Sequence, residues 1–533
     1  MDKILEINNL VIDFESNDSI FRAVDDISLT IEGGKTLSLV GESGSGKSVT
    51  ALSILQLLPE GTVQYSSESS IKFESDEIIS CPKKPLSALR GNKISMIFQE
   101  PMTSLNPYQK VGFQIDETLI IHKKLSSKQA REKTIDLLKK VKIPEPETKV
   151  DSYPHQLSGG QRQRIMIAMA LANDPEILVA DEPTTALDVT IQAEILELLR
   201  ELRRENNMGL ILITHDLGVA AKSADNVIVM KDGEIVEKGT LKNVFSNPKS
   251  SYTKRLMSSL PGKKKKFLDQ LKKNKNKKPI LSVAKLTKTY DDLVACNNIS
   301  FDLYSGETLG IVGESGSGKT TISNLILKLT QPSSGEIKFH GEDIISLNKN
   351  KLLSFRRKVQ VVFQDPFASL NPKMNILDIV CEPLIIHKKF INKSVNIVKK
   401  AKNLLENVGI DNNLCNRFPH EFSGGQRQRI AIARALALEP EIIICDEAVS
   451  ALDVSIQSQV IELLIQLRNQ HSLSYIFIAH DLPVVKDLAD RVLVMKDGNI
   501  IEQGNVGEVF NNPRKTYTKE LLNSSPTLDH YIL

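Results

Sequence analysis

The octapeptide GESGSGKS occupies residues 41–48, and almost the same sequence, GESGSGKT, returns at residues 313–320. A second motif, SGGQRQRI, also occurs twice, at residues 158–165 and 423–430. Both copies of each motif stand in the same order along the chain. The sequence therefore contains an internal duplication.

The spacing of equivalent residues shows how much of the chain is duplicated. Gln99 and Gln364 are 265 positions apart, and so are His215 and His480. Such a period indicates a whole duplicated domain, because solenoid repeats have periods of about 20–50 residues. The lysines of the two octapeptides are 272 positions apart, so the first copy has seven extra residues, which we place in the Ser-rich stretch 62–85.

A lysine-rich segment separates the two copies. We predict a first domain at residues 1–260, a linker at 261–278 and a second domain at 279–533. The linker contains nine lysines and few apolar residues, which is typical of a solvated connection. A nucleic-acid or acidic-lipid patch is the alternative, and the lack of interleaved aromatic residues and arginines argues against it.

Composition places the chain among ordinary globular proteins. Of its 533 residues, 41% are hydrophobic and 25% are charged, and the formal net charge is +3. The five cysteines are scattered without a CxxC pair, as expected for reduced thiols. No run approaches the about 20 apolar residues that cross a bilayer, and the N-terminus does not read as a secretory signal. We therefore expect a cytoplasmic protein that acts on a membrane only through partner subunits.

Short apolar runs predict an α/β core in each copy. KTLSLV directly precedes the first octapeptide, EILVADE ends in adjacent acids, and GLILITHD ends in His-Asp; ETLGIV, EIIICDE and LSYIFIAHD repeat the pattern. Helices are expected directly after the octapeptides. The reactive residues then fall at the carboxyl ends of parallel strands, where open α/β sheets bind ligands.

The octapeptide fits the pattern GxxxxGK[ST], a loop that binds phosphate. Its glycines let backbone N–H groups approach phosphate oxygens, and the following helix adds its N-terminal dipole. The lysine should reach the β- and γ-phosphates, and the final hydroxyl should ligand Mg²⁺. The candidate residues are Gly41, Ser43, Gly44, Gly46, Lys47 and Ser48 in the first copy, and Gly313, Ser315, Gly316, Gly318, Lys319 and Thr320 in the second.

Two acid pairs supply candidate catalytic groups, Asp181-Glu182 and Asp446-Glu447. A strand-end Asp can hold Mg²⁺ while the adjacent Glu faces an attacking water. Adjacent carboxylates are common on solvated loops, but here each pair ends an apolar strand and a His follows 33 residues after the Glu. We expect Glu182 and Glu447 to be catalytic, with the histidines, His215 and His480, sensing or orienting the γ-phosphate.

The SGGQ motif predicts a second phosphate clamp. A Ser and two glycines just before a helix offer a hydroxyl and N–H groups to an anion. The candidate residues are Ser158, Gly160, Gln161, Ser423, Gly425 and Gln426. Two clamps in one domain suggest that each nucleotide is held by two domains at once.

The combined motifs resemble those of the ATP-binding cassette (ABC) ATPases. The segments IFQEPMTSLNP (97–107) and VFQDPFASLNP (362–372) resemble those of oligopeptide, dipeptide and nickel importer ATPases, as do the tails that begin NPKSSYTKRL and NPRKTYTKEL. The first half looks most similar to the fused ATPase of microcin C-type peptide importers, followed by that of glutathione importers.

This resemblance implies two tandem P-loop NTPase domains, each with a mainly parallel β-sheet core, an α-helical signature subdomain and an antiparallel β subdomain. The family pairs such domains head to tail, so that the phosphate loop of each works with the SGGQ of the other. Mg²⁺ would be bound by Ser48, Gln99 and Asp181, and by Thr320, Gln364 and Asp446. The implied cofactors are ATP and Mg²⁺. The implied partners are two permease subunits and, indirectly, a solute-binding protein. The resemblance places this chain itself at the cytoplasmic face of the inner membrane, as a peripheral subunit; no nucleic acid is expected.

Three further expectations follow from the resemblance. Tyr290 stands where the family places an adenine-stacking aromatic; in the first half Phe14 is the candidate and Phe21 its rival, with an ordinary core aromatic as the third reading. An iron–sulfur cluster is not expected, because no cysteine lies between Cys81 and Cys296. Ala448 replaces the usual Pro in DEAVSALD, which should change that loop only slightly.

Two other functions stay open at this point. A twin-cassette ATPase acting on ribosomes or DNA is disfavoured, because the ribosomal type reads TNHLD where this chain has TTALD and VSALD. An importer of nickel, glutathione or another non-peptide solute is the second alternative. The transported solute is not encoded in these motifs, and a peptide is favoured.

Overall fold

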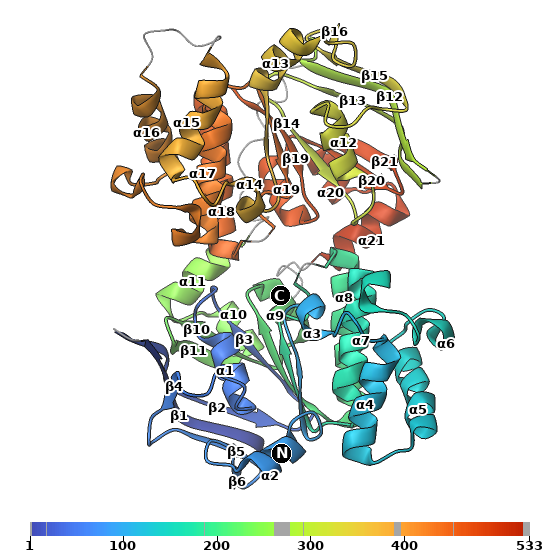
Figure 1. The fold of residues 1–533 in the computed structure, drawn as a ribbon, viewed down its shortest axis with the longest axis vertical. Helices are drawn as coiled ribbons and strands as arrows, with labels where there is room; N and C mark the ends of the chain where they lie inside the picture. Colours follow the sequence, from blue (N-terminus) through green and yellow to red (C-terminus); the bar gives the residue numbers. More distant parts are fainter. Residues whose placement is uncertain are drawn as a thin grey trace. The chain divides into compact units, whose positions relative to one another are not determined.

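The computed structural model describes residues 3–16, 19–185, 187–260, 278–291, 293–388, 396–450 and 452–525 (Figure 1). The chain forms two compact units. The first holds Met1–Leu187 and Ile191–Ser258, and the second holds Ser259–Ser525; we call them the first and second halves. The expected linker at 261–278 lies outside the described residues except for Lys278.

A six-stranded sheet forms the centre of the first half. Five of its strands are parallel, and β11 is antiparallel to its neighbour β10. In spatial order the strands are β11 (Glu234–Thr240), β10 (Asn226–Lys231), β3 (Thr36–Val40), β9 (Gly209–Thr214), β8 (Ile177–Asp181) and β7 (Ile94–Ile97). Every residue of β3, β8 and β9 is buried, as expected for parallel strands covered on both faces.

Alternate residues of these strands serve two separate cores. Along β8, Leu178 and Ala180 pack with the helices, whereas Ile177 and Val179 pack with the second sheet of the same half. Successive side chains of a strand point to opposite faces, so one strand contributes to both cores. The central sheet is therefore the middle layer, and the site residues that follow its strands are fixed from both sides.

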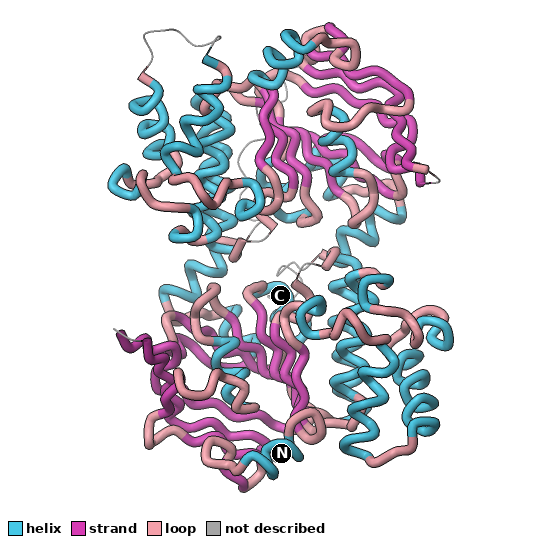
Figure 2. Tube along the Cα trace, viewed as in Figure 1, coloured by secondary structure: helices cyan, strands magenta, loops and turns pink. Residues whose placement is uncertain are grey.

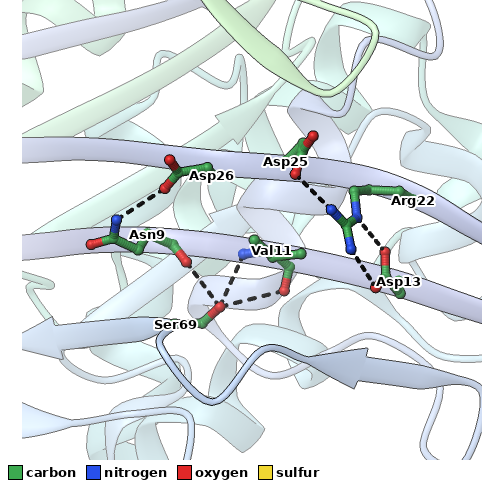
Figure 3. A network of polar contacts seen from close by, with 7 residues as sticks. All are labelled: Asn9, Val11, Asp13, Arg22, Asp25, Asp26 and Ser69. Atoms are coloured by element: carbon green, nitrogen blue, oxygen red, sulfur yellow. Dashed lines mark hydrogen bonds and ion pairs between the residues drawn. The ribbon is translucent and has the colours of Figure 1, made fainter.

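The second sheet of the first half is antiparallel and carries the long β1–β2 hairpin. Its strands are β2 (Ser19–Glu32), β1 (Lys3–Ser16), β5 (Ser70–Phe73) and β6 (Asp76–Glu77), with β4 (Val63–Tyr65) also paired to β1. Figure 3 shows polar contacts that hold its register: the Arg22 guanidinium donates to both carboxylate oxygens of Asp13, at 2.9 and 3.2 Å, and to Asp25 at 3.0 Å. The Ser69 hydroxyl accepts from the Val11 N–H at 2.9 Å, beside a break in the β1–β2 register.

The helices of the first half lie around the central sheet, and the group from α3 to α7 lies to one side of both sheets (Figures 1 and 2). Their bounds are α1 (Lys47–Ile54), α2 (Lys83–Leu89), α3 (Pro101–Ser104), α4 (Val111–Lys123), α5 (Ser127–Lys140), α6 (Pro146–Lys149), α7 (Gly159–Leu171), α8 (Val189–Asn206), α9 (Leu217–Ser223), α10 (Leu241–Ser246) and α11 (Ser251–Ser258).

The second half repeats this architecture. Its central sheet contains β21 (Asn499–Asn505), β20 (Arg491–Lys496), β14 (Thr308–Val312), β19 (Ser474–Ile478), β18 (Ile442–Asp446) and β17 (Val359–Val362). Its antiparallel sheet contains β13 (Leu293–Leu303), β12 (Leu281–Tyr290), β15 (Ser334–Phe339) and β16 (Glu342–Asp343). Its helices are α12 (Lys319–Ile326), α13 (Lys349–Lys358), α14 (Pro366–Ser369), α15 (Ile376–Ile386), α16 (Ile397–Asn407), α17 (Gly424–Leu436), α18 (Val454–His471), α19 (Leu482–Leu488), α20 (Val506–Asn511) and α21 (Thr516–Ser524).

The structure confirms the predicted α/β fold with its parallel core, helical subdomain and antiparallel subdomain. The apolar runs form β3, β8 and β9 and their counterparts, and helices begin at the lysines of both octapeptides. The extra strand β4 of the first half lies within the stretch 62–85, where the additional residues were placed. Among the described helices, none is long and apolar enough to span a bilayer. All five cysteines are free thiols.

Candidate active site

The phosphate loop of the first half joins β3 to α1, and its backbone requires glycine. Gly46, directly before α1, has φ of 94°, in the left-handed region, and Gly318 has φ of 98° at the same place in the second half. A Cβ on Gly318 would also lie 2.2 Å from the Ala295 carbonyl oxygen. Glycine tolerates this conformation without strain, so the loop can turn into the helix with its N–H groups exposed to a phosphate.

The loop lysines are buried and held by the loop itself. The Lys47 ammonium donates to the Gly41 and Glu42 carbonyl oxygens at 2.9 and 2.7 Å and to the Ser45 hydroxyl at 3.1 Å. Lys319 makes the two carbonyl contacts at 2.8 and 2.7 Å. Burial lowers the pKa of Lys319, and the nearby Glu447 carboxylate opposes that shift. A bound phosphate would therefore give each lysine ammonium charged oxygens as acceptors in place of the neutral carbonyl oxygens.

A hydroxyl and a carboxylate meet at each predicted Mg²⁺ site. The Ser48 hydroxyl donates to Asp181 at 3.1 Å, and the Thr320 hydroxyl donates to Asp446 at 3.4 Å. Burial and the adjacent Glu447 charge raise the pKa of Asp446 to about 6, and burial likewise raises the pKa of Asp181. Buried oxygen donors of this kind suit Mg²⁺, and a bound cation would favour the ionised carboxylates. The residues present therefore fit the ion.

Glu182 is held by three side chains around its carboxylate. Gln99 and Thr185 donate to Oε2 at 3.0 and 2.7 Å, and His215 Nδ1 lies 3.0 Å from Oε1. Burial raises the pKa of Glu182, but its contacts with His215 and Thr185 outweigh burial and lower it overall. The carboxylate is thus kept ionised at the end of β8. Thr185 was not among the sequence candidates, although a hydroxyl three residues after the glutamate could have marked it.

Glu447 has a related but simpler set of contacts. Gln364 donates to Oε2 at 2.9 Å, and His480 Nδ1 lies 3.5 Å from the same oxygen. The hydrogen bond to His480 lowers the pKa of Glu447. Burial would lower the pKa of His480, yet the Glu447 contact raises it overall. Both halves therefore bring the predicted Gln, Glu and His together after neighbouring strands.

The predicted second clamp is a capping box at the start of a helix. The Ser158 hydroxyl accepts from the Gln161 backbone N–H at 3.3 Å, and the Gln161 side chain accepts from the Ser158 N–H at 3.1 Å. Ser423 and Gln426 form the same box, with distances of 3.3 and 3.0 Å. The motif is thus a well-formed helix N-terminus, and its role as a phosphate clamp stays a prediction.

The glycines of this motif have a packing role that the sequence did not reveal. A Cβ on Gly160 would lie 2.8 Å from Ile191 Cγ2, and one on Gly425 would lie 2.2 Å from Ile456 Cγ2. The start of each signature helix therefore packs closely against the long helix after the acid pair, α8 or α18. A residue larger than glycine would force these helices apart.

Sheet register indicates which aromatics are equivalent at the expected adenine positions. Tyr290 pairs with Leu293 across β12 and β13, and Phe14 pairs with Phe21 across β1 and β2. Tyr290 is 42% exposed, with the Lys288 ammonium 4.7 Å from its ring centroid. Phe21 is 65% exposed, whereas Phe14 packs partly into the core. Register makes Phe14 the counterpart of Tyr290, and Phe21 remains its more exposed neighbour.

Comparisons with known proteins agree with this geometry. The family model described as ABC transporter matches residues 24–185 and 296–450. The model described as oligopeptide/dipeptide transporter, C-terminal region, matches residues 236–291 and 501–532. Each half therefore carries both a cassette and the C-terminal region of this transporter class.

Several curated proteins are similar over almost the whole chain. A peptidoglycan transport ATP-binding protein, YejF, from Agrobacterium fabrum is 46% identical and covers 97% of this chain and 96% of its own length. An ABC transporter ATP-binding protein YejF from Escherichia coli is also 46% identical, covering 97% and 99%. A glutathione import ATP-binding protein, GsiA, from Shigella boydii is 44% identical, covering 99% and 90%. The chain therefore belongs to the ABC transporter family, as an ATP-hydrolysing protein with two cassettes, each followed by an oligopeptide/dipeptide-type C-terminal region.

Proposed function

We propose that this chain energises the import of peptides through a membrane permease, with ATP hydrolysed at two sites. The observation that carries the proposal is the double occurrence of one set of parts. Each half supplies a phosphate loop, a hydroxyl–carboxylate pair, a Gln–Glu–His group and a transporter-type C-terminal region. The domain division at 1–260, 261–278 and 279–533 is part of this proposal.

The hydrolytic step assigns a role to each residue of the site. Ser48, Asp181 and Gln99 would hold Mg²⁺, and the ion would neutralise charge on the phosphates. Glu182 accepts a proton from the water whose oxygen attacks the γ-phosphorus, while the bond to the ADP oxygen breaks. His215, already 3.0 Å from Glu182, fixes the orientation of that carboxylate. Thr320, Asp446, Gln364, Glu447 and His480 act in the same way in the second half.

Each site is completed, in this proposal, by the signature motif of the other half. Ser423, Gly425 and Gln426 would close the site of Lys47, and Ser158, Gly160 and Gln161 that of Lys319. The support is chemical: each signature is a helix N-terminus with a serine hydroxyl, a suitable partner for a γ-phosphate. ATP would draw the halves together, and loss of the γ-phosphate would release them.

Exposed apolar side chains beside Gln99 and Gln364 suit contacts with a permease. Phe98 and Met102 are 37% and 50% exposed in the first half, and Phe363 and Phe367 are 39% and 57% exposed in the second. Large apolar side chains at a surface are typical of protein interfaces. The same segments lie next to the glutamines that bind Mg²⁺ in this proposal. Permease movement could thus be linked to hydrolysis at the cytoplasmic face of the membrane.

Peptide import can be tested by uptake in cells that lack the gene. The strain would be complemented with the wild-type chain or with Lys47→Ala plus Lys319→Ala, and supplied with a radiolabelled cell-wall tripeptide, glutathione or Ni²⁺. The relatives named for peptidoglycan and glutathione transport motivate the first two probes. We expect tripeptide uptake only with the wild-type chain. Uptake restricted to glutathione or Ni²⁺ would contradict the peptide assignment.

A further inference from the structure

The C-terminal region of each half contacts the phosphate loop of the same half. The Tyr252 hydroxyl, in α11, accepts a hydrogen bond from the Glu42 backbone N–H at 3.3 Å. The Tyr517 hydroxyl, in α21, accepts from the Glu314 N–H, also at 3.3 Å. We propose that these two tyrosines are positioning residues for the phosphate loops. The inference rests on the proposed nucleotide sites and adds the transporter-type C-terminal region to them.

Equivalent local contacts in the two halves place each tyrosine. The Glu237 carboxylate, on β11, accepts from the backbone N–H groups of Lys249 and Ser250 at 2.8 and 3.0 Å. These residues form the turn that starts α11. In the second half Glu502 accepts from Arg514 and Lys515 at 2.9 and 3.2 Å. The turn is therefore tied to the sheet, which fixes where α11 and α21 begin.

The tyrosine rings are buried beside cations. The Lys231 ammonium lies 5.7 Å from the Tyr252 ring centroid, and the Lys496 ammonium lies 4.6 Å from that of Tyr517. Burial raises the pKa of each phenol to about 12. Both hydroxyls are therefore neutral at physiological pH and can accept from a backbone N–H without adding negative charge next to a phosphate site.

The hydrogen bond acts on a residue that also restrains the loop lysine. The Glu42 carbonyl accepts from the Lys47 ammonium at 2.7 Å, while the Glu42 N–H donates to the Tyr252 hydroxyl. The residue is thus fixed at both ends, one position after Gly41, where the loop begins. Without the tyrosine hydroxyl the loop would sample more conformations, and ATP binding would have to select the competent one.

A second hydrogen bond to each phosphate loop limits the effect of losing the tyrosine hydroxyl. The Gly233 N–H donates to the Ser45 carbonyl at 3.3 Å, and the Gly498 N–H donates to Ser317 at 3.2 Å. The turn between β10 and β11, and its counterpart in the second half, therefore support the same loop. Loss of one tyrosine hydroxyl should weaken nucleotide binding without unfolding the loop.

The test is Tyr252→Phe in the full chain with the second half silenced by Glu447→Gln. The ring stays and only the hydroxyl goes, so we expect the KM for ATP to rise about threefold to tenfold, the range that one net hydrogen bond supplies. We expect kcat to change less than about twofold, because the loop binds ground state and transition state alike. Tyr517→Phe with Glu182→Gln should raise the KM for ATP of the second half in the same way.

Two controls separate the possible failures. Tyr65→Phe removes another part-buried tyrosine hydroxyl, bonded to Gln56 at 3.4 Å, and should leave KM unchanged. Lys47→Ala should abolish the remaining ATP hydrolysis in the same background. If Lys47→Ala hydrolyses ATP normally, the proposed site itself is wrong. If Lys47→Ala is inactive while Tyr252→Phe keeps its KM, or loses only thermal stability, the positioning role alone is overturned.

Discussion

Glu182 and Glu447 stand at the same place in the two halves, and the exposed fraction of each side chain is the same, 14%. Their hydrogen-bond partners differ. In the first half the Thr185 hydroxyl donates to the glutamate carboxylate at 2.7 Å, whereas in the second half the Ser450 hydroxyl donates to the backbone carbonyl of Glu447 at 2.9 Å. Thr185 and His215 also approach different oxygens of Glu182, which fixes the plane of its carboxylate.

This difference would have its largest consequence if, in the proposed function, Gln99 and Gln364 left the glutamates to bind Mg²⁺. Glu182 would then keep one contact on each oxygen, whereas Glu447 would keep the 3.5 Å contact with His480 on a single oxygen. A carboxylate held in one orientation is a better general base than one free to rotate. Duplicated halves can thus differ in rate through one hydroxyl while the Gln, Glu and His of the site stay the same.

The largest expected effect comes from removing both bases. Glu182→Gln plus Glu447→Gln should lower steady-state ATP hydrolysis at least about 100-fold, the minimum that general-base catalysis supplies. Each single variant isolates one half, and the chain that retains Glu182 should be the faster. Phosphate release would be measured at saturating ATP. A double variant with more than a tenth of wild-type activity would show that another group is the base.

The next largest difference between the two halves concerns the packing of the signature helices. Gly425→Ala should lower stability by about 1–3 kcal/mol, because its Cβ would lie 2.2 Å from Ile456. Gly160→Ala should cost less, since its nearest atom, on Ile191, is 2.8 Å away. Scanning calorimetry of the two variants would show the ranking. Gly424→Ala is the control, because its nearest neighbour is at an ordinary 3.6 Å; equal melting temperatures for all three would contradict the packing argument.

Loss of the Thr185 hydroxyl should have a moderate effect on the rate of ATP hydrolysis. Thr185→Val in a Glu447→Gln background removes the hydroxyl at nearly constant volume and should lower kcat about threefold to tenfold, the worth of one hydrogen bond. Ser450→Ala in a Glu182→Gln background should change kcat less than about twofold, since that hydroxyl bonds to a backbone oxygen. The kcat of the two single-site variants would be measured side by side. Equal losses of kcat would contradict the proposed difference between the two halves.

The smallest effect concerns the β1–β2 hairpin. Arg22 pairs with Asp13 and Asp25 in the first half, and the corresponding cross-strand pair in the second half is Val294 with Thr289. Because the Arg22 side chain is 53% exposed, Arg22→Val should lower stability only slightly. The loss should shrink further at high salt, since exposed charges are screened. Urea unfolding at two salt concentrations would measure it, and a salt-independent loss would indicate packing instead.

Local sequence patterns predicted the fold well because the central strands are uninterrupted apolar runs. EILVADE and GLILITHD could hardly form anything but buried strands, and the reactive residues follow them directly. Gln99, Glu182 and His215, which the structure brings together after these strands, were therefore in the predicted set, whereas Thr185 was not. Tandem duplication helped further, because each assignment could be checked 265 or 272 residues away in the other half.

Contacts that depend on tertiary packing could not be predicted from the sequence patterns. Thr185 and Ser450 look interchangeable in sequence, and only side-chain geometry separates them. Tyr252 lies more than 200 residues after the loop that it contacts, so no local spacing could join them. The closeness of Gly160 to Ile191 depends on how α7 and α8 pack, which helix periodicity does not specify.

The capping box at Ser158 bears on how readily a phosphate could be received there. A serine hydroxyl has two lone pairs and one proton, and capping uses only a lone pair, through the Gln161 N–H. The proton remains for an incoming anion, so binding need not break the cap. Serine can therefore cap the helix and donate to a phosphate with the same oxygen. Aspartate could also cap the helix, but its charge would repel the phosphate. In the proposed phosphate clamp, this position therefore requires an acceptor that can also donate.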